Sequence, residues 1–169
     1  GPGVMRGYEN NPAANERAFM NGWFRTGDQG YLDTEGYLFL TGRLKELINR
    51  GGEKISPREV EELLLDHPAV AEAVTFAVPH DTLGEDIAAA VVFREQTSVT
   101  ARDLQEFAAT RLAEFKVPRQ VVIVDEIPKS ALGKVQRVGL AEKLGLTISG
   151  EPSANAQYVA PRTPVEDQL

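Results

Sequence analysis

The sequence predicts a small α+β domain between about residues 46 and 146. Two segments begin with helix-capping residues, and three segments have the apolar pattern of strands. The predicted order is helix, strand, strand, helix, strand, helix. We therefore expect a small three-stranded sheet with flanking helices and a β-hairpin, preceded by a short β-rich segment.

The first helix is expected in the segment ISPREVEELLLDHP. Ser56 is a suitable N-cap, Pro57 takes the first helical position, and Glu59 completes a capping box. Apolar residues then recur at helical spacing. Because a residue that precedes proline disfavours the helical conformation, the helix should end before His67–Pro68.

Three apolar segments predict the strands. AVAEAVTFAVP alternates large apolar side chains with smaller or polar ones, which is typical of a strand. DIAAAVVF is a continuous apolar run, which indicates a central strand that is covered on both faces. QVVIVDEI supplies the third strand.

Two further helices are expected later in the chain. The segment TARDLQEFAATRLAEF begins with Thr100 and Asp103, which form a second capping pattern. A last short helix is expected from about Arg137 to Leu144.

The two ends of the chain differ from this central part. Residues 1–41 are rich in glycine, asparagine and aromatic residues and look irregular, apart from two short strands predicted around a turn at Asp33–Gly36. Residues 147–169 are small and polar, contain three prolines and show little periodicity, which predicts a linker.

Composition excludes several classes of function. The chain has 169 residues, a formal net charge of −7, no cysteine and two histidines, so thiolate chemistry is absent and a metal site is not expected. The acidic balance argues against a nucleic-acid partner. The sequence has neither a membrane-spanning apolar run nor a signal peptide, so a cytoplasmic protein is expected.

One stretch departs from the acidic balance. Residues 116–137 hold five cationic and two acidic residues, which indicates either a local anion site or a solvated surface. Within it, PKSALGKVQR places Lys134 directly after Gly133. A P-loop needs glycine five positions before this pair and Ser or Thr after it, and Pro128 and Val135 stand there instead.

Three motifs together resemble the late motifs of the adenylate-forming enzymes. They are GWFRTGD at 22–28, GRLKELINRGGEKISPREVE at 42–61, and Gly133–Lys134, and they occur in the order that is usual in this superfamily. The superfamily contains acyl-CoA synthetases, adenylation domains of non-ribosomal peptide synthetases, and luciferases. The resemblance covers about residues 1–146 and implies the C-terminal domain of such an enzyme.

The resemblance also implies a domain organisation. Residues 1–44 would be the end of a large N-terminal adenylation domain, whose remainder is expected before residue 1. Residues 45–146 would be the mobile C-terminal subdomain, and residues 147–169 would be a linker and the possible start of a carrier domain. A chain with only part of the large domain is expected to be inactive on its own.

The resemblance assigns roles to individual residues. Lys134 matches the catalytic lysine that reaches the carboxylate and the nucleotide during adenylation, where one ammonium can offset two anions. Asp28 matches the aspartate that accepts hydrogen bonds from the ribose hydroxyls, since its two oxygens suit a vicinal diol. Arg43 matches a residue that also contacts the nucleotide.

Lys45 matches the hinge about which the small domain rotates between the two half-reactions. After rotation, the loop that contains Arg50, Gly51, Gly52 and Glu53 would line the pantetheine tunnel, where glycine permits a close backbone approach. The two glycines are equally consistent with an ordinary hairpin turn.

The sequence departs from the common pattern at three positions in this region. Lys45 stands where aspartate is common, Asn49 where lysine is usual, and Lys54 where arginine or glutamine is usual. The segment EFKVPRQVVIVDEIPKSALGKVQR resembles the acyl-CoA synthetase branch more than the amino-acid-activating branch. INRGGEKISP resembles synthetases of small acids, including oxalate.

The implied reaction uses ATP, with Mg²⁺ bound through the N-terminal domain, to convert a small carboxylic acid into an acyl-adenylate. A thiol then forms a thioester. YVAPRTPVEDQL resembles the junction between adenylation and carrier domains, so the expected acceptor is the phosphopantetheine of a downstream carrier domain. Two alternatives stay open: a free-standing acyl-CoA synthetase of a small acid, with coenzyme A as acceptor, and an inactive α+β interaction module.

Overall fold

The computed structural model describes residues 1–95, 97, 99–131 and 133–146. The chain forms two compact units, one that ends at Lys45 and one that begins at Glu46. The linker expected at residues 147–169 lies outside the described residues.

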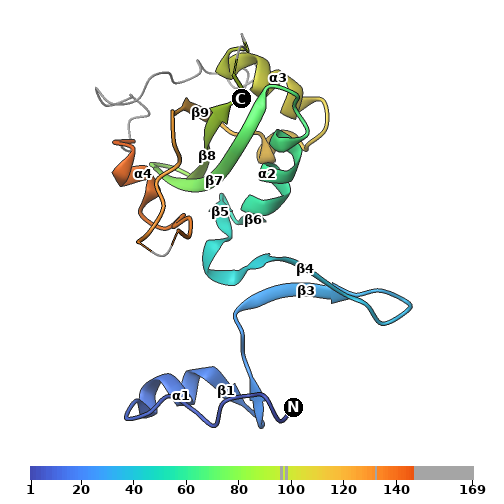
Figure 1. Cartoon of the computed structure of the whole chain (residues 1–169), viewed down its shortest axis with the longest axis vertical. Coiled ribbons are helices and arrows are strands. Elements are labelled where there is room, and N and C mark those ends of the chain that lie inside the picture. The colour runs from blue at the N-terminus through green and yellow to red at the C-terminus, as the bar shows by residue number, and fades with distance from the viewer. Residues whose placement is uncertain (96, 98, 132, 147–169) are drawn as a thin grey trace. The chain divides into compact units, whose positions relative to one another are not determined.

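The first unit consists of one short helix and two hairpins (Figure 1). Strands β1 and β2 pair with each other, and β3 pairs with β4 around the turn that was predicted from sequence. Its elements are α1 (Pro12–Ala18), β1 (Phe19–Met20), β2 (Trp23–Phe24), β3 (Asp28–Leu32) and β4 (Leu38–Arg43). None of residues 1–45, all of which the structure describes, is buried, so this unit has no core of its own.

Helix α1 was not expected, because this stretch of the sequence looked irregular. Its start nevertheless has a recognisable signal: Pro12 occupies the first turn and the side chain of Asn11 accepts a hydrogen bond from the N–H of Ala14. The helix is short and none of its residues is buried. Its sequence therefore lacks the apolar periodicity that would have predicted a helix.

The second unit confirms the predicted order of helices and strands. After η1 (Leu44–Glu46) come β5 (Ile48–Arg50), β6 (Glu53–Ile55), α2 (Pro57–Leu65), β7 (Val70–His80), β8 (Gly84–Phe93), α3 (Ala101–Ala109), η2 (Glu114–Lys116), β9 (Gln120–Ile123) and α4 (Leu140–Lys143).

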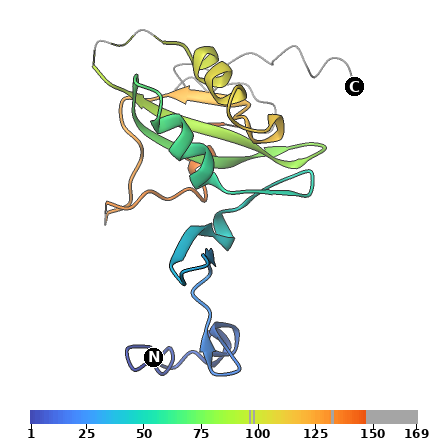
Figure 2. The same ribbon diagram turned by 90° about the vertical axis from the view of Figure 1, so that its right-hand side faces the viewer.

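The three expected strands and the expected hairpin are present in the second unit, and they form one five-stranded sheet. Strands β6, β5, β8 and β7 follow one another across the sheet, and β9 pairs with β8 in parallel (Figures 1 and 2). The hairpin β5–β6 joins the sheet because β8 extends to Gly84, beyond its pairing with β9, and Gly84 pairs there with Arg50.

Two apolar clusters cover the two faces of this sheet. Helices α2 and α3 lie on one face, and α4 lies on the other (Figure 1). Alternate residues of β8 enter the two clusters: Ala89 and Val91 pack under α2 and α3, whereas Ala88 and Ala90 pack on the side of α4. This confirms the prediction of a central strand that is buried on both faces.

The helix caps agree with the sequence at α3 and differ at α2. At α3, Thr100 and Asp103 form both bonds of the predicted capping box. At α2, the side chain of Ser56 makes no capping hydrogen bond, and Glu59 pairs with Lys116 at 2.6 Å instead. The predicted box at α2 is therefore wrong, because a distant cation competes for the carboxylate.

The last two helices are shorter than their sequences suggested. Helix α3 ends at Ala109, and the chain then forms turns and η2. Helix α4 begins only at Leu140, because Gly139 adopts a left-handed conformation with φ of 78° and interrupts any helix that would start at Arg137.

Candidate functional site

Lys134 lies on a small closed loop. The N–H of Ser130 donates to the carbonyl of Lys134 at 2.8 Å, and the N–H of Lys134 donates to the Ser130 hydroxyl oxygen at 3.2 Å. Gly133 completes the turn with φ of 72° and donates to the carbonyl of Ser130. The backbone at Lys134 is thus held by local hydrogen bonds.

The ammonium group of Lys134 is exposed, and within the described part of the chain it has no hydrogen-bond or ion-pair partner. Other cations of the same stretch are paired. Lys116 binds Glu59 at 2.6 Å and Lys129 binds Glu72 at 3.1 Å. The cationic stretch therefore leaves one exposed ammonium available to a ligand.

Arg137 is held by two carboxylates. Its Nε and one terminal nitrogen donate to the two oxygens of Glu61 at 3.0 and 2.7 Å, and its other terminal nitrogen donates to Glu46 at 2.7 Å. Hydrogen bonding to Glu61 raises the pKa of Arg137. The sequence analysis counted Arg137 only as a cation, because partners 76 and 91 positions away leave no local pattern.

The loop between β5 and β6 is a two-residue hairpin turn. Gly51 and Gly52 have φ of 59° and 100°, between the paired residues Arg50 and Glu53. Positive φ at both turn positions matches the twist of the flanking strands and explains the Gly-Gly pair. The N–H of Gly51 also donates to the carbonyl of Leu83 at 2.9 Å.

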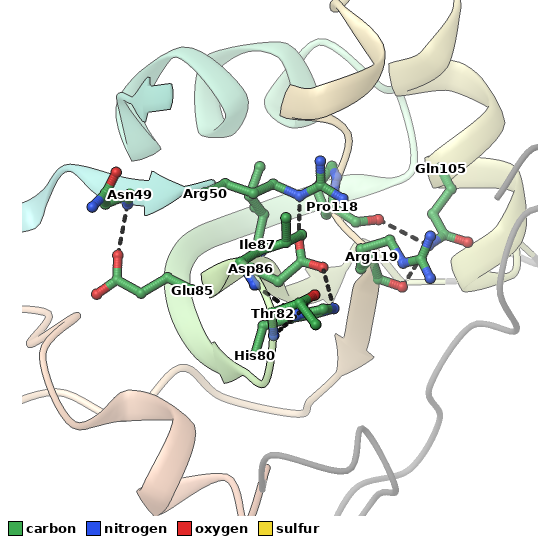
Figure 3. A network of polar contacts seen from close by, with 11 residues as sticks. Asn49, Arg50, His80, Thr82, Glu85, Asp86, Ile87, Gln105, Pro118 and Arg119 are labelled. Atoms are coloured by element: carbon green, nitrogen blue, oxygen red, sulfur yellow. Dashed lines mark hydrogen bonds and ion pairs between the residues drawn. The ribbon is translucent and has the colours of Figure 1, made fainter. Parts of the chain in front are cut away.

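A polar network fixes this hairpin to the turn between β7 and β8 (Figure 3). The Nε of Arg50 donates to Asp86 at 2.7 Å, where the Asp86 side chain is 6% exposed. The N–H of Asn49 donates to Glu85 at 2.6 Å. Asp86 was not predicted from the sequence as a site residue. It anchors the hairpin through contacts that form only in the folded sheet.

His80 stabilises the same turn. Its Nδ1 accepts hydrogen bonds from the N–H groups of Thr82 and Leu83, and its Nε2 lies 4.0 Å from Asp86 (Figure 3). On α3, the side-chain amide of Gln105 donates to the carbonyls of Pro118 and Arg119 and fixes the chain just before β9.

Asp28 and Arg43 are brought together in the first unit. They are paired across β3 and β4, and the Nε of Arg43 lies 3.1 Å from Asp28. The side chain of Arg43 is 68% exposed, so the pair can exchange its mutual contact for a ligand. Lys45 is exposed in η1, at the last position of the first unit.

Two kinds of feature are absent from the described residues, a cluster of metal ligands and a membrane-spanning helix. No group of three or more His, Cys, Asp and Glu side chains among them could hold a metal ion. None of the helices formed by the described residues has both the length and the apolar character to cross a bilayer.

Comparison with known proteins places these features in a family. Residues 59–134 match the family described as AMP-binding enzyme C-terminal domain. The chain is 58% identical to the oxalate–CoA ligase of Arabidopsis thaliana over 137 residues, which are 81% of this chain and 27% of that protein. The chain thus spans little more than a quarter of the length of the curated relatives that it matches.

Solved structures agree. ATP-bound MatB from Rhodopseudomonas palustris matches with a TM-score of 0.80 and 35% identity, covering 85% of this chain and 29% of MatB. The o-succinylbenzoate CoA synthetase MenE from Bacillus subtilis, in complex with its acyl-adenylate intermediate, matches with a TM-score of 0.76 and 43% identity, covering 83% of this chain and 28% of MenE. The chain therefore belongs to the adenylate-forming enzymes and contains their AMP-binding enzyme C-terminal domain.

Proposed function

We propose that the chain acts as the mobile C-terminal domain of an ATP-dependent ligase that joins a small carboxylic acid to the thiol of coenzyme A. The similarity to an oxalate–CoA ligase, at 58% identity, supports both the reaction and a small, acidic substrate. Its necessary partner is a large N-terminal adenylation domain, which would bind ATP with its Mg²⁺ and the acid.

The observation that carries this proposal is the exposed ammonium of Lys134 on its closed loop. Adenylation brings a carboxylate against the α-phosphate of ATP, so negative charge accumulates as the acyl-phosphate bond forms. A fixed backbone with an unpaired ammonium can offset this charge without first breaking an internal ion pair. Lys134 is thus the catalytic residue of the first half-reaction.

The second half-reaction uses another part of the domain. The turn at Arg50–Glu53 is narrow and lacks side chains at its two glycines, so a pantetheine arm can lie close to the backbone. Anchoring of Arg50 by Asp86 gives the loop a defined shape. Arg50 in this proposal supports the loop, since its side chain is only 17% exposed.

Rotation between the two half-reactions takes place at Lys45. The boundary between the two compact units, which falls between Lys45 and Glu46, supports this position for the hinge. Asp28 and Arg43, just before it, bind the ribose and the nucleotide. Their cross-strand pair supports this role because Arg43 is exposed and the side chain of Asp28, at 27% exposure, is still partly accessible to a ligand.

A second candidate differs only in the acceptor. The resemblance of YVAPRTPVEDQL to an adenylation–carrier junction favours the phosphopantetheine of a fused carrier domain, although these residues lie outside the described part of the chain. The similarity to the oxalate–CoA ligase of Arabidopsis thaliana and to a probable CoA ligase of Humulus lupulus favours coenzyme A. Thioester formation is measured with free coenzyme A and with a carrier domain that bears a free phosphopantetheine thiol. The acceptor that is acylated faster separates the two candidates.

The proposal is tested by Lys134→Ala in the intact enzyme. Adenylation, measured by pyrophosphate exchange, should fall by about 10²-fold or more, because one electrostatic group in a closed site typically contributes that much. Thioester formation from a supplied acyl-adenylate should stay nearly normal.

The matched control is Lys143→Ala, which removes another cationic side chain from the same domain, bonded only to Gln136 at 3.3 Å among the described contacts. It should leave both half-reactions unchanged. Equal loss of both half-reactions in Lys134→Ala, or no loss of adenylation, would contradict the assigned role.

A further inference from the structure

We propose that Arg137 is a positioning residue for Lys134. Its guanidinium, held by Glu61 and Glu46, fixes the chain that leaves the lysine loop and so places the ammonium group for adenylation. This inference rests on the proposed function, in which Lys134 carries the first half-reaction.

The geometry of the three residues is that of a fixed anchor. Arg137 makes a two-bond fork to Glu61 and a third bond to Glu46, all between 2.7 and 3.0 Å. Charge-assisted bonds of this length define a direction as well as a distance, and only a guanidinium can satisfy both carboxylates at once. A lysine at this position would keep the charge and lose the geometry.

Glu61 is itself immobilised. It lies on α2, is 7% exposed, and its Oε1 accepts a hydrogen bond at 2.7 Å from the N–H of Thr75 on β7. The carboxylate therefore belongs to the rigid part of the domain, where a helix and a strand meet. Arg137 thereby fixes the segment after Lys134, which has little regular structure, to the rigid part of the domain.

The same segment is held at other points, and these contacts differ from that of Arg137. Lys129 and Val135 form a backbone bridge that closes the lysine loop on itself, and the partly buried Val135 also packs against the apolar cluster on the side of α4. The bridge is local to the loop, and an apolar contact is non-directional. Arg137, three positions after Lys134, supplies a directional contact from this segment to helix α2.

Glu46 gives the anchor a second consequence. It is the first residue of the second unit and follows Lys45, the proposed hinge. The guanidinium thus ties the start of the rotating domain to the segment that carries the lysine, through a bond of 2.7 Å. Rotation at the hinge then moves Lys134 with the domain instead of leaving it behind on a flexible loop.

The test is a pair of variants in the intact enzyme, Arg137→Gln alone and combined with Lys134→Ala. Arg137→Gln should lower the rate constant of adenylation by roughly 10- to 100-fold, which is the cost of misplacing a reacting group by about an ångström. Thioester formation from a supplied acyl-adenylate should stay nearly unchanged. In the Lys134→Ala background, Arg137→Gln should cause no further loss of adenylation, because it acts only through Lys134.

A structural role without positioning predicts different results. It would slow both half-reactions together, and it would lower adenylation further in the Lys134→Ala background; either result overturns the inference, as does an unchanged rate in Arg137→Gln. If Lys134→Ala alone leaves adenylation intact, the proposed function fails first, so the two failures are distinguishable.

Two further variants keep the test informative if Arg137→Gln does not fold. Glu46→Gln removes the more exposed carboxylate and leaves the fork to Glu61, so it should give the same selective loss of adenylation in smaller measure. Arg102→Gln, which breaks an exposed pair with Glu106 on α3, is the matched control and should leave both half-reactions unchanged. Selective loss in Arg102→Gln, or none in Glu46→Gln, would contradict the inference.

Discussion

Glu61 illustrates how a single buried charge is accommodated in this domain. Its side chain is only 10% exposed, which would be costly for an isolated carboxylate. Two nitrogens of Arg137 and the N–H of Thr75 together satisfy its oxygens. Loss of Arg137 would leave the buried carboxylate of Glu61 with only the N–H of Thr75, so the cluster favours one arrangement of its residues.

Asp103 offers a test at the same scale, through the pH dependence of stability. Hydrogen bonds from the backbone N–H and the hydroxyl of Thr100 lower the pKa of Asp103. The unfolded chain has the ordinary aspartate pKa of about 3.9. The stability contributed by this carboxylate is therefore fully present above about pH 4 and is lost as the pH falls through the lower, folded pKa.

We expect Asp103→Asn to remove this pH-dependent contribution. The difference in the free energy of unfolding between the unchanged protein and the variant should be constant at neutral pH and should shrink in acid. Denaturant unfolding of both proteins at a series of pH values measures it. A difference that is independent of pH would show that the capping bonds do not favour the ionised form.

Among the elements, the hairpin of β5 and β6 depends most on tertiary contacts. Three residue pairs join its strands, and such a short hairpin is marginal by itself. Its attachment to Gly84, the bond from Gly51 to Leu83, and the ion pair of Arg50 with Asp86 fix it to the turn between β7 and β8. The shape of the proposed tunnel loop is thus set by residues that are more than thirty positions away.

Asp86→Asn tests this dependence. The change leaves the charge of Arg50 largely buried without its carboxylate, which should cost on the order of 2–3 kcal/mol of stability. In the intact enzyme, thioester formation should fall by roughly tenfold while adenylation stays near normal, because a misplaced loop affects only the step that it lines. The two half-reaction assays measure this selectivity.

Glu106→Gln is the control for Asp86→Asn, since it removes a carboxylate from an exposed ion pair. It should change the free energy of unfolding by no more than a few tenths of a kcal/mol. Both half-reactions should be unchanged. A loss of adenylation as large as the loss of thioester formation in Asp86→Asn would indicate a general structural role for the hairpin.

At the scale of the whole molecule, the two compact units differ in their source of stability. The second unit has apolar clusters on both faces of a five-stranded sheet. The first has no buried residue in Gly1–Lys45 and exposes large apolar side chains on β3 and β4, including Tyr31, Leu38 and Phe39. An exposed apolar surface of this kind is typical of a contact with another domain or protein.

We expect residues 1–169 alone to catalyse no pyrophosphate exchange above background with a panel of small acids. They carry Asp28, Arg43 and Lys134, yet they span little more than a quarter of their relatives' length. A lysine by itself cannot hold two substrates in attack geometry, where much of the rate gain originates. Robust exchange would show that the chain contains a whole active site and would refute the need for a partner domain.

By itself, the sequence determined those features that depend on neighbours along the chain. The order of helices and strands in the second unit, the buried character of β8 and the capping box of α3 follow from local spacing and were predicted correctly. Three motifs in order sufficed to identify the family. The roles assigned to Lys134, Asp28, Arg43 and Lys45 came with that resemblance and stay predictions.

Tertiary structure alone decided what depends on residues far apart in the sequence. Glu59 pairs with Lys116, 57 positions away, instead of forming the predicted cap. The hairpin β5–β6 is part of the sheet because Arg50 pairs with Gly84. Arg137 found carboxylates 76 and 91 positions away, which made it an anchor instead of one more cation. The interaction energy of two side-chain charges depends on their distance in space. Periodicity along the chain gives no information about that distance.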